Sequence, residues 1–166
     1  MAAAATPIAF DWRRATGADV FTLAALYRDA ALRLGPQVYT PEQARAWASF
    51  ADDAPGFRAY VLDAETWIAE RPGDGRALGF CGVSLHDRLG EVHSLYVTPA
   101  RTRQGLGTEM LRRSLERATA AGATRFAAWA TPFSRPVFVA AGFALTQAVE
   151  APFAGTMFER YRVERG

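Results

Sequence analysis

The sequence predicts an α/β (α+β) fold in which helices flank a mixed, mostly antiparallel sheet. One segment of the first half places apolar residues three and four positions apart, as a helix with one buried face does, and a second begins with a helix-capping pattern. The middle alternates strand-like runs with turns, and the last part alternates strands with two more helices. A chain of 166 residues has the length of one domain. We therefore expect a single domain over residues 1–166, with residues 1–7 as a flexible tail.

The first expected elements are a strand at Ile8–Arg13 and a helix that Asp19 caps. The helix is expected because its apolar residues recur every three or four positions: Val20, Leu23, Leu26, Tyr27, Ala30, Ala31 and Leu34. Gly35 and Pro36 end this helix, since neither residue continues one well.

A second helix is expected to begin at Thr40. Thr40 suits the N-cap, Pro41 suits the first helical position, and Gln43 stands three residues after the cap, as in a capping box. We expect this helix to run to about Phe50. Residues 57–63 fit a helical turn and a strand equally well.

Three strands are expected in the middle of the chain. Thr66–Glu70 and Ala77–His86 flank a turn at 71–76, and a second turn at 87–90 leads to Glu91–Val97. Consecutive strands joined by short turns pair antiparallel, so these strands form a meander.

The last third alternates helices and strands. A helix with one apolar face is expected between Leu106 and Gly122. The remaining expected elements are a strand at Thr124–Ala130, a short helix from Pro136 to Gly142, and a final strand pair at Phe143–Glu150 and Thr156–Val163.

The composition excludes several kinds of chemistry. All 19 basic residues are arginine, so neither a Walker lysine nor a lysine Schiff base is present. One cysteine permits no intramolecular disulfide, and two histidines make a His/Cys zinc site unexpected, so we expect no metal. The net charge of +2 is spread along the chain, and no signal peptide or membrane span is evident. We expect a cytoplasmic protein that binds neither nucleic acid nor membranes.

An anion site is expected between the strands at Glu91–Val97 and Thr124–Ala130. Gly105, Leu106 and Gly107 directly precede a helix N-terminus, where unpaired N–H groups and the helix dipole favour a negative charge. Arg101 and Arg103 add positive charge beside them, so a pyrophosphate suits the site. The spacing does not fit a dinucleotide-binding turn, because the glycines do not follow the strand directly.

Two motifs give this segment a family resemblance. Leu95–Pro99, followed after a polar loop by Gly105-Leu106-Gly107 and a helix, resembles the acetyl-CoA signature of the GNAT superfamily of N-acetyltransferases. Ser134–Phe143 resembles the second motif of the same family. The order of the elements is also similar over residues 8–163, and Tyr39–Gln43 with Trp47 resembles a bacterial subgroup.

The resemblance implies a site for acetyl-CoA and a sheet that splays between 91–97 and 124–130. Pantetheine would lie like an added strand beside Leu95, Tyr96 and Val97. The pyrophosphate would rest on the backbone of Arg103, Gln104, Gly105, Leu106, Gly107 and Thr108. Thr131, Ser134 and Phe138 would line the cofactor wall. Thr102 stands where the family usually has glutamine or arginine. This weakens the expected side-chain contact to the pyrophosphate and leaves the expected backbone contacts unchanged.

Three residues are candidates for proton transfer. Glu91 and His93 stand two apart on one strand, so their side chains share a face, and an incoming ammonium must lose a proton before it attacks. Each also has a purely structural interpretation, as a strand-end carboxylate and a hydrogen-bonded strand histidine. Phe138 stands where the family often has an acidic tyrosine. Tyr161 of the last strand is the substitute candidate, although such an aromatic more often packs on the sheet.

The expected activity is acetyl transfer from acetyl-CoA to a primary amine by direct attack in a ternary complex. A backbone N–H at a strand bulge near Leu95 would stabilise the oxyanion. The acceptor would be a small-molecule or peptide amine, and the oligomeric state stays open. The alternatives are a non-catalytic acyl-CoA sensor or interaction domain on the same fold and, less favoured, a thioesterase or amidase that uses Cys81.

Overall fold

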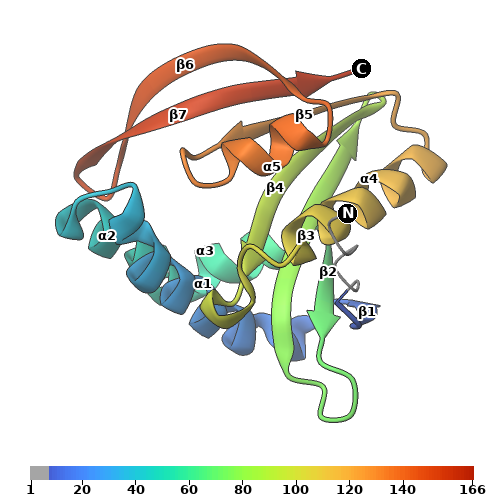
Figure 1. Cartoon of the computed structure of the whole chain (residues 1–166), viewed down its shortest axis with the longest axis horizontal. Coiled ribbons are helices and arrows are strands. Elements are labelled where there is room, and N and C mark those ends of the chain that lie inside the picture. Colours follow the sequence, from blue (N-terminus) through green and yellow to red (C-terminus); the bar gives the residue numbers. More distant parts are fainter. Residues whose placement is uncertain (1–7) are drawn as a thin grey trace, which may run out of the picture.

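Seven strands form one sheet in the order β1-β2-β3-β4-β5-β7-β6 in the computed structural model, which describes residues 8–166 (Figure 1). The strands are β1 (Asp11–Arg14), β2 (Glu65–Glu70), β3 (Ala77–His86), β4 (Leu89–Val97), β5 (Arg125–Ala130), β6 (Ala144–Phe153) and β7 (Thr156–Arg165). The helices are α1 (Val20–Leu34), α2 (Pro41–Ala48), α3 (Ala54–Leu62), α4 (Leu106–Ala120) and α5 (Arg135–Ala140). Neighbouring strands are antiparallel except for β4 and β5, which are parallel. The expected mixed, mostly antiparallel sheet is confirmed.

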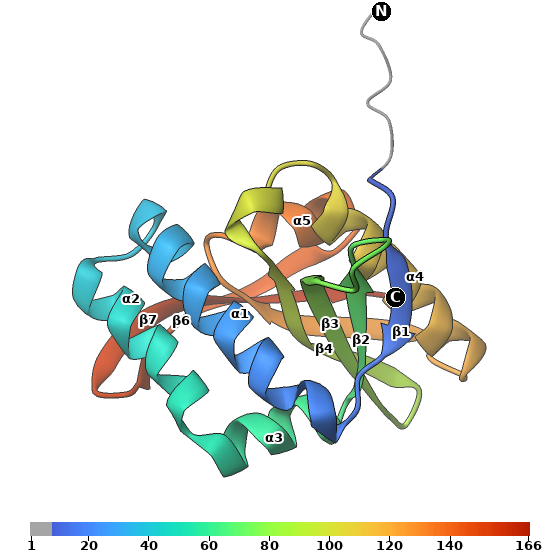
Figure 2. The same ribbon diagram turned by 90° about the horizontal axis from the view of Figure 1, so that it is seen from below.

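Helices cover both faces of the sheet. Figure 2 shows α1, α2 and α3 on one side and α4 and α5 on the other. Leu23 of α1 and Phe57 of α3 pack against Phe80 of β3 in one core. Met110 of α4 and Phe138 of α5 belong to a second core on the opposite face. All five side chains are at most 3% exposed, so each face of the sheet carries its own hydrophobic layer. None of the helices between residues 8 and 166 has the length and apolar character that a membrane span requires.

Capping side chains set the starts of α2 and α3. Thr40 Oγ1 accepts from the Gln43 N–H at 3.1 Å and Gln43 Oε1 accepts from the Thr40 N–H at 2.9 Å, which confirms the capping box. The α2 helix stops at Ala48 and a 3₁₀ turn over Ser49–Asp52 follows, so the expected end near Phe50 is wrong. Residues 57–63 belong mostly to α3, whose N-cap Asp53 accepts from the Gly56 N–H at 3.1 Å.

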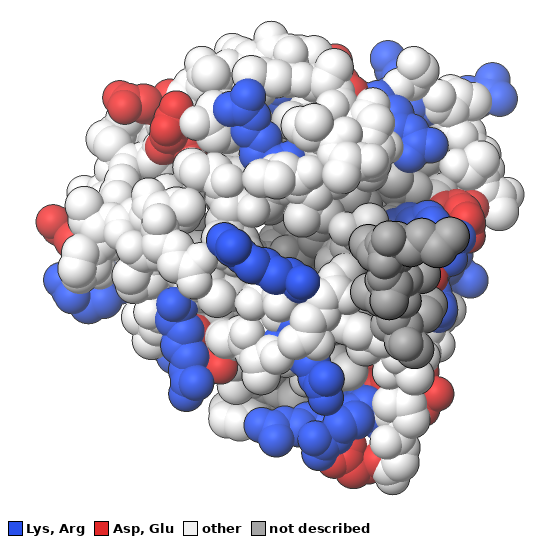
Figure 3. Space-filling view, viewed as in Figure 1, with Lys and Arg blue, Asp and Glu red and all other residues white. Residues whose placement is uncertain are grey.

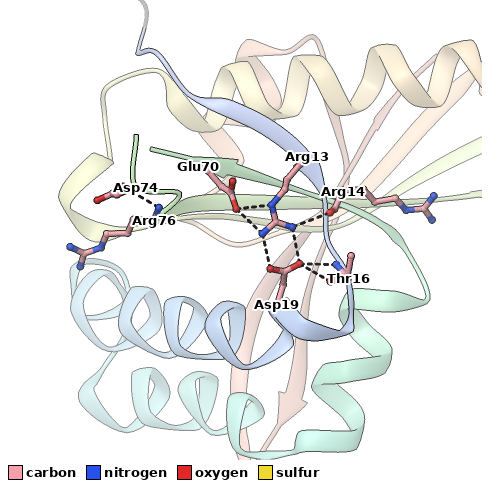
Figure 4. Close-up of polar contacts among 7 residues, drawn as sticks. All are labelled: Arg13, Arg14, Thr16, Asp19, Glu70, Asp74 and Arg76. Atoms are coloured by element: carbon pink, nitrogen blue, oxygen red, sulfur yellow. Dashed lines mark hydrogen bonds and ion pairs between the residues drawn. The ribbon is translucent and has the colours of Figure 1, made fainter. Parts of the chain in front are cut away.

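The start of α1 is tied to the sheet by ion pairs. The Asp19 carboxylate accepts from the Thr16 N–H at 2.8 Å and pairs with Arg13 at 2.7 Å, and it makes no cap bond to α1. Arg13 also pairs with Glu70 of β2 at 2.6 Å (Figure 4). The expected capping role of Asp19 is therefore wrong, because Arg13 and the preceding turn hold its carboxylate. The Arg13 guanidinium lowers the pKa of Asp19 to about 2.

Most strands begin or end one to three residues from the expected positions, and only β3 has the expected bounds. The first strand is Asp11–Arg14, three residues later than expected at its start. The third strand of the meander begins at Leu89, because Asp87 and Arg88 alone form the turn, with φ of +46° and +66°. The expected tail at residues 1–7 lies outside the described residues.

Candidate active site

The sheet splits between β4 and β5. These strands pair only over Leu89–Val92 and Arg125–Ala128, and they separate after that point. Residues 95–97 of β4 keep β3 as a neighbour on one side and, within residues 8–166, have no strand on the other. The splayed strand pair that the resemblance implies is thus confirmed. An extended ligand can add to the free strand edge by main-chain hydrogen bonds.

A β-bulge marks the point of separation. Val83 pairs with Val92 and Gly82 pairs with Ser94, which leaves His93 as an extra residue in β4. The bulge expected near Leu95 therefore lies two residues earlier. Bulges re-aim side chains, and here the His93 side chain lies where the sheet opens.

A cleft of about 460 Å³ occupies the split. Its walls come from α1, α2, β4, the loop before α4, the end of β5 and α5. The expected cofactor residues that line it are Leu95, Tyr96, Val97, Arg103, Gly105, Gly107, Thr108, Thr131, Ser134 and Phe138. Gln104 and Leu106 are not among its lining residues: Gln104 donates from Nε2 to the Ala100 carbonyl at 3.2 Å, and Leu106 is 1% exposed in the core. Figure 3 shows a hollow near the middle of this face with basic side chains beside it.

The loop before α4 has the features of an anion-binding site. The first helical bond runs from the Glu109 N–H to the Gly105 carbonyl at 3.0 Å, so the N–H groups of residues 106–108 have no intrahelical acceptor. Gly105 has φ +81°, and no atom lies within 4 Å of the position that a Cβ would take there. Arg101 and Arg103 also line the cleft. Free N–H groups, an open glycine and two guanidiniums together fit a pyrophosphate.

A second cavity of about 280 Å³ adjoins the cleft. It lies between the N-terminal helices and the β6–β7 hairpin, and most of its lining is aromatic. The two cavities share the lining residues Trp47, Val92, His93, Tyr96, Trp129 and Thr131. They therefore meet at the bulge, where the strands separate.

His93 is exposed where the two cavities meet, and its Nε2 lies 2.6 Å from Ser84 Oγ. Partial burial lowers the pKa of His93 below its ordinary 6.5, and the negative charge of Glu91 opposes this effect. The imidazole is therefore neutral at pH 7 and can accept a proton.

Glu91 lines the second cavity with His93, but its carboxylate is already paired. Arg162 of β7 holds it in a two-pronged contact, with Nη1 at 2.5 Å from Oε1 and Nη2 at 3.0 Å from Oε2. The carboxylate is thus fixed in place beside the histidine, and its charge is largely balanced by Arg162.

Tyr161 lies apart from both cavities. Phe158 and Arg160 of β7 line the second cavity, whereas Tyr161 alternates with them and packs, partly buried, against the core that contains Phe138 of α5. The Arg135 guanidinium lies 4.7 Å from the centre of its ring. A hydrogen bond with Glu159 raises the pKa of Tyr161. The structure therefore places Tyr161 away from Glu91 and His93.

Cys81 is wholly buried in the sheet, and burial raises the pKa of its thiol to about 12. A thiol in this state is no nucleophile at neutral pH, so the thioesterase and amidase alternative is dropped. Within the described residues, no group of three or more His, Cys, Asp or Glu side chains could hold a metal ion.

Several residues of the site escaped the sequence analysis. Arg162 was not expected, and it stands 71 positions from its partner Glu91. Tyr96 was expected only through its backbone, yet its hydroxyl accepts from the Trp47 Nε1–H at 3.3 Å where the cavities meet. Tyr60 donates to the His93 carbonyl at 2.8 Å. For Arg162 the alternation of β7 was a usable signal, because it places residues 158, 160 and 162 on one face.

The comparisons with known proteins agree with this geometry. Residues 24–143 match the model of the acetyltransferase (GNAT) family. The chain belongs to that family. Its members are acetyltransferases that use acetyl-CoA as co-substrate, and the matched range includes the split strands, the anion loop and both motifs of the resemblance. A search of curated proteins finds no match.

Solved GNAT structures share the fold. A GCN5-related N-acetyltransferase from Rhodopseudomonas palustris is 24% identical, with a TM-score of 0.86 over 96% of this chain and 97% of that one. The PaiA N-acetyltransferase from Thermoplasma acidophilum, solved with coenzyme A, is 14% identical, with a TM-score of 0.77 over 95% and 99%. A phosphinothricin acetyltransferase from Sinorhizobium meliloti, solved with acetyl-CoA, is 23% identical, with a TM-score of 0.68 over 95% and 88%. At these identities the likeness establishes the fold.

Proposed function

We propose that this acetyltransferase moves the acetyl group of acetyl-CoA to a primary amine, by direct attack while both substrates are bound. The observation that carries the proposal is the meeting of two cavities at the His93 bulge. One cavity suits the donor and the other the acceptor, so the amine nitrogen and the thioester carbon come together where they meet. Holding two reactants in contact removes much of the barrier to their reaction.

The donor side of the proposal rests on backbone groups. Pantetheine would pair with the free edge of residues 95–97, and the pyrophosphate would bind the free N–H groups of residues 106–108 beside Arg101 and Arg103. Acetyl-CoA supplies an activated acyl group with a fair leaving group. A backbone N–H of β4 beside the bulge would stabilise the oxyanion.

The acceptor side of the proposal rests on His93. Neutral His93 would take the proton that the incoming ammonium must lose. Glu91, fixed by Arg162, would stabilise the protonated imidazole rather than take the proton itself. Tyr161 has no role in this scheme because it lies outside both cavities, and Phe138 has no hydroxyl to donate, so the thiolate leaves without a tyrosine acid at either position.

A screen of primary amines tests the proposal. Purified protein is mixed with acetyl-CoA and pools of small amines and short peptides, and thiol release is followed together with mass spectrometry of the products. N-acetylated product in step with released thiol is expected. Tight acetyl-CoA binding with no acetylated product from any pool would contradict the proposal and favour a non-catalytic acyl-CoA sensor.

A further inference from the structure

Most of the residues that line the second cavity are aromatic. Tyr39 meets Phe158 edge to face with 5.2 Å between ring centres, and it meets Trp47 at 5.7 Å. The Phe153 ring lies 6.2 Å from that of Phe158 and 6.2 Å from that of Phe50. Rings that already pack edge to face form a surface suited to another planar ring. The chemistry of this lining therefore favours an acceptor with an aromatic body.

A hydrogen bond joins α2 to the β6–β7 hairpin, two elements that both line the cavity. Gln43 donates from Nε2 to the Met157 carbonyl at 2.9 Å, which ties the hairpin to the helix. The cavity volume of about 280 Å³ is close to the lower end of small-molecule sites, which hold roughly 300–1,000 Å³. A small free molecule fits this space better than a long polypeptide segment does.

One cation in the cavity has no counter-charge. Arg160 lines the cavity from β7 and has no carboxylate partner among residues 8–166. The next arginine on the same face, Arg162, is held by Glu91. Glu91 and His93 also face this space and can carry a charge near neutral pH. Glu91 is paired with Arg162, and His93 is neutral at pH 7. The cavity thus presents one net positive charge.

A free guanidinium beside aromatic rings is a receptor for a carboxylate on an aromatic molecule. We propose that the acceptor is a small aromatic amine that carries a carboxylate, of the class of free aromatic α-amino acids. Its carboxylate binds Arg160, its ring packs among the aromatic side chains, and its amine faces His93. This inference rests on the proposed N-acetyltransferase function and adds the class of acceptor.

Matched amines test the inference. The rates of acetylation of L-phenylalanine, 2-phenylethylamine and L-phenylalaninamide are compared in the parent and in Arg160→Met. In the parent, kcat/KM for L-phenylalanine should exceed that for 2-phenylethylamine by about 10- to 100-fold, as for a charge-assisted contact. In Arg160→Met this preference should disappear, mainly through KM, while the rate with 2-phenylethylamine changes little.

Arg165→Met is the matched control. Arg165 belongs to the same strand but donates to the Ala141 carbonyl beside α5, outside the cavity. This variant should keep the parental preference, which separates loss of the carboxylate contact from general damage to β7.

The remaining outcomes overturn the inference in distinguishable ways. Equal rates with L-phenylalanine and 2-phenylethylamine, unchanged in Arg160→Met, would refute the carboxylate contact and leave the N-acetyltransferase function standing. A rate with L-phenylalaninamide that matches or exceeds that with L-phenylalanine would refute it in favour of peptide N-termini. No turnover of these three amines, with turnover of others in the amine screen, refutes the acceptor class alone. No turnover of any amine refutes both proposals.

Discussion

His93 is the residue on which the proposed chemistry depends most. Its side chain stands where the two cavities meet, and burial keeps its pKa below 6.5. His93→Ala should lower kcat/KM by about 10²–10⁴-fold, the usual effect of removing a general base. Acetyl-CoA affinity, measured by titration calorimetry, should change far less.

His86→Ala is the control for this prediction, because it removes the other histidine of the chain from the end of β3, outside both cavities. It should keep the parental rate. Near-parental kcat/KM for His93→Ala from pH 6 to 9 would show that the proton leaves by another route.

Glu91 gives a separate prediction about pH. Its negative charge raises the pKa of His93, against the lowering effect of burial. A general base works only when unprotonated, so the parental kcat/KM should fall on acidification below pH 6.5. Glu91→Gln should move this fall to still lower pH and reduce the plateau less than His93→Ala does. A pH–rate profile of the parent and the variant checks both predictions. If the fall in kcat/KM moved to higher pH in Glu91→Gln, Glu91 would not stabilise the protonated imidazole.

Substitutions of Gly107 test the proposed pyrophosphate site. A Cβ at this position would lie 3.5 Å from Val97 Cγ2, an ordinary contact, so Gly107→Ala should fold and bind acetyl-CoA. Gly107→Glu places a carboxylate beside the free N–H groups of α4 and should weaken acetyl-CoA binding by at least about tenfold through charge repulsion.

Gly107→Gln has nearly the size of the glutamate variant without its charge, so it should bind acetyl-CoA more tightly than Gly107→Glu. If titration calorimetry finds the parental acetyl-CoA affinity in Gly107→Glu, the pyrophosphate does not bind at the N-terminus of α4.

At the scale of elements, the ion pairs that tie β1, β2 and the start of α1 make a prediction about stability. Asp19 has a folded pKa of about 2 against an ordinary 3.8. Because the folded value is the lower one, its stabilisation is full above pH 3.8 and is lost as the pH falls through 2. Asp19→Asn should therefore lower the free energy of unfolding by about 1 kcal/mol at pH 7, and the difference from the parent should vanish near pH 2.

Asp74→Asn is the control for the Asp19 prediction. Asp74 also has a pKa lowered to about 2, but its partner Arg71 lies in the same exposed turn, where water screens the pair. Urea unfolding at pH 7 should show a smaller loss for Asp74→Asn than for Asp19→Asn. Equal losses would mean that the tie between β1 and α1 adds nothing beyond a local surface pair.

Helices and strands were predictable where their sequence signals lie within a few residues of one another. The periodic apolar residues of α1 and the capping box of α2 each depend on residues a few positions apart, and the structure confirms both helices. The α3 helix was left open because residues 57–63 omit its first turn, where Asp53 and Pro55 carry the start signal. The Asp19 cap failed because Arg13 competes for the same carboxylate, a contact that depends on how β1 meets α1.

At the scale of the whole molecule, the proposed donor site was more predictable than the proposed acceptor site. The donor site is nearly contiguous, since residues 95–108 supply both the strand edge and the anion loop. The acceptor cavity is assembled from α1, α2, α3, β4 and the β6–β7 hairpin. No local pattern brings Arg160 and Tyr39 to the same cavity, because that depends on how the hairpin packs beside α2.

A matrix of initial rates, in which acetyl-CoA and an amine from the screen are both varied, tests most directly whether donor and acceptor meet at His93. Two cavities that share lining residues hold both substrates at once, so the double-reciprocal lines should intersect, and mass spectrometry should find no acetylated protein when acetyl-CoA is given alone. Parallel lines together with a covalent acetyl-protein would show that the acetyl group passes through the protein first, and would contradict direct attack.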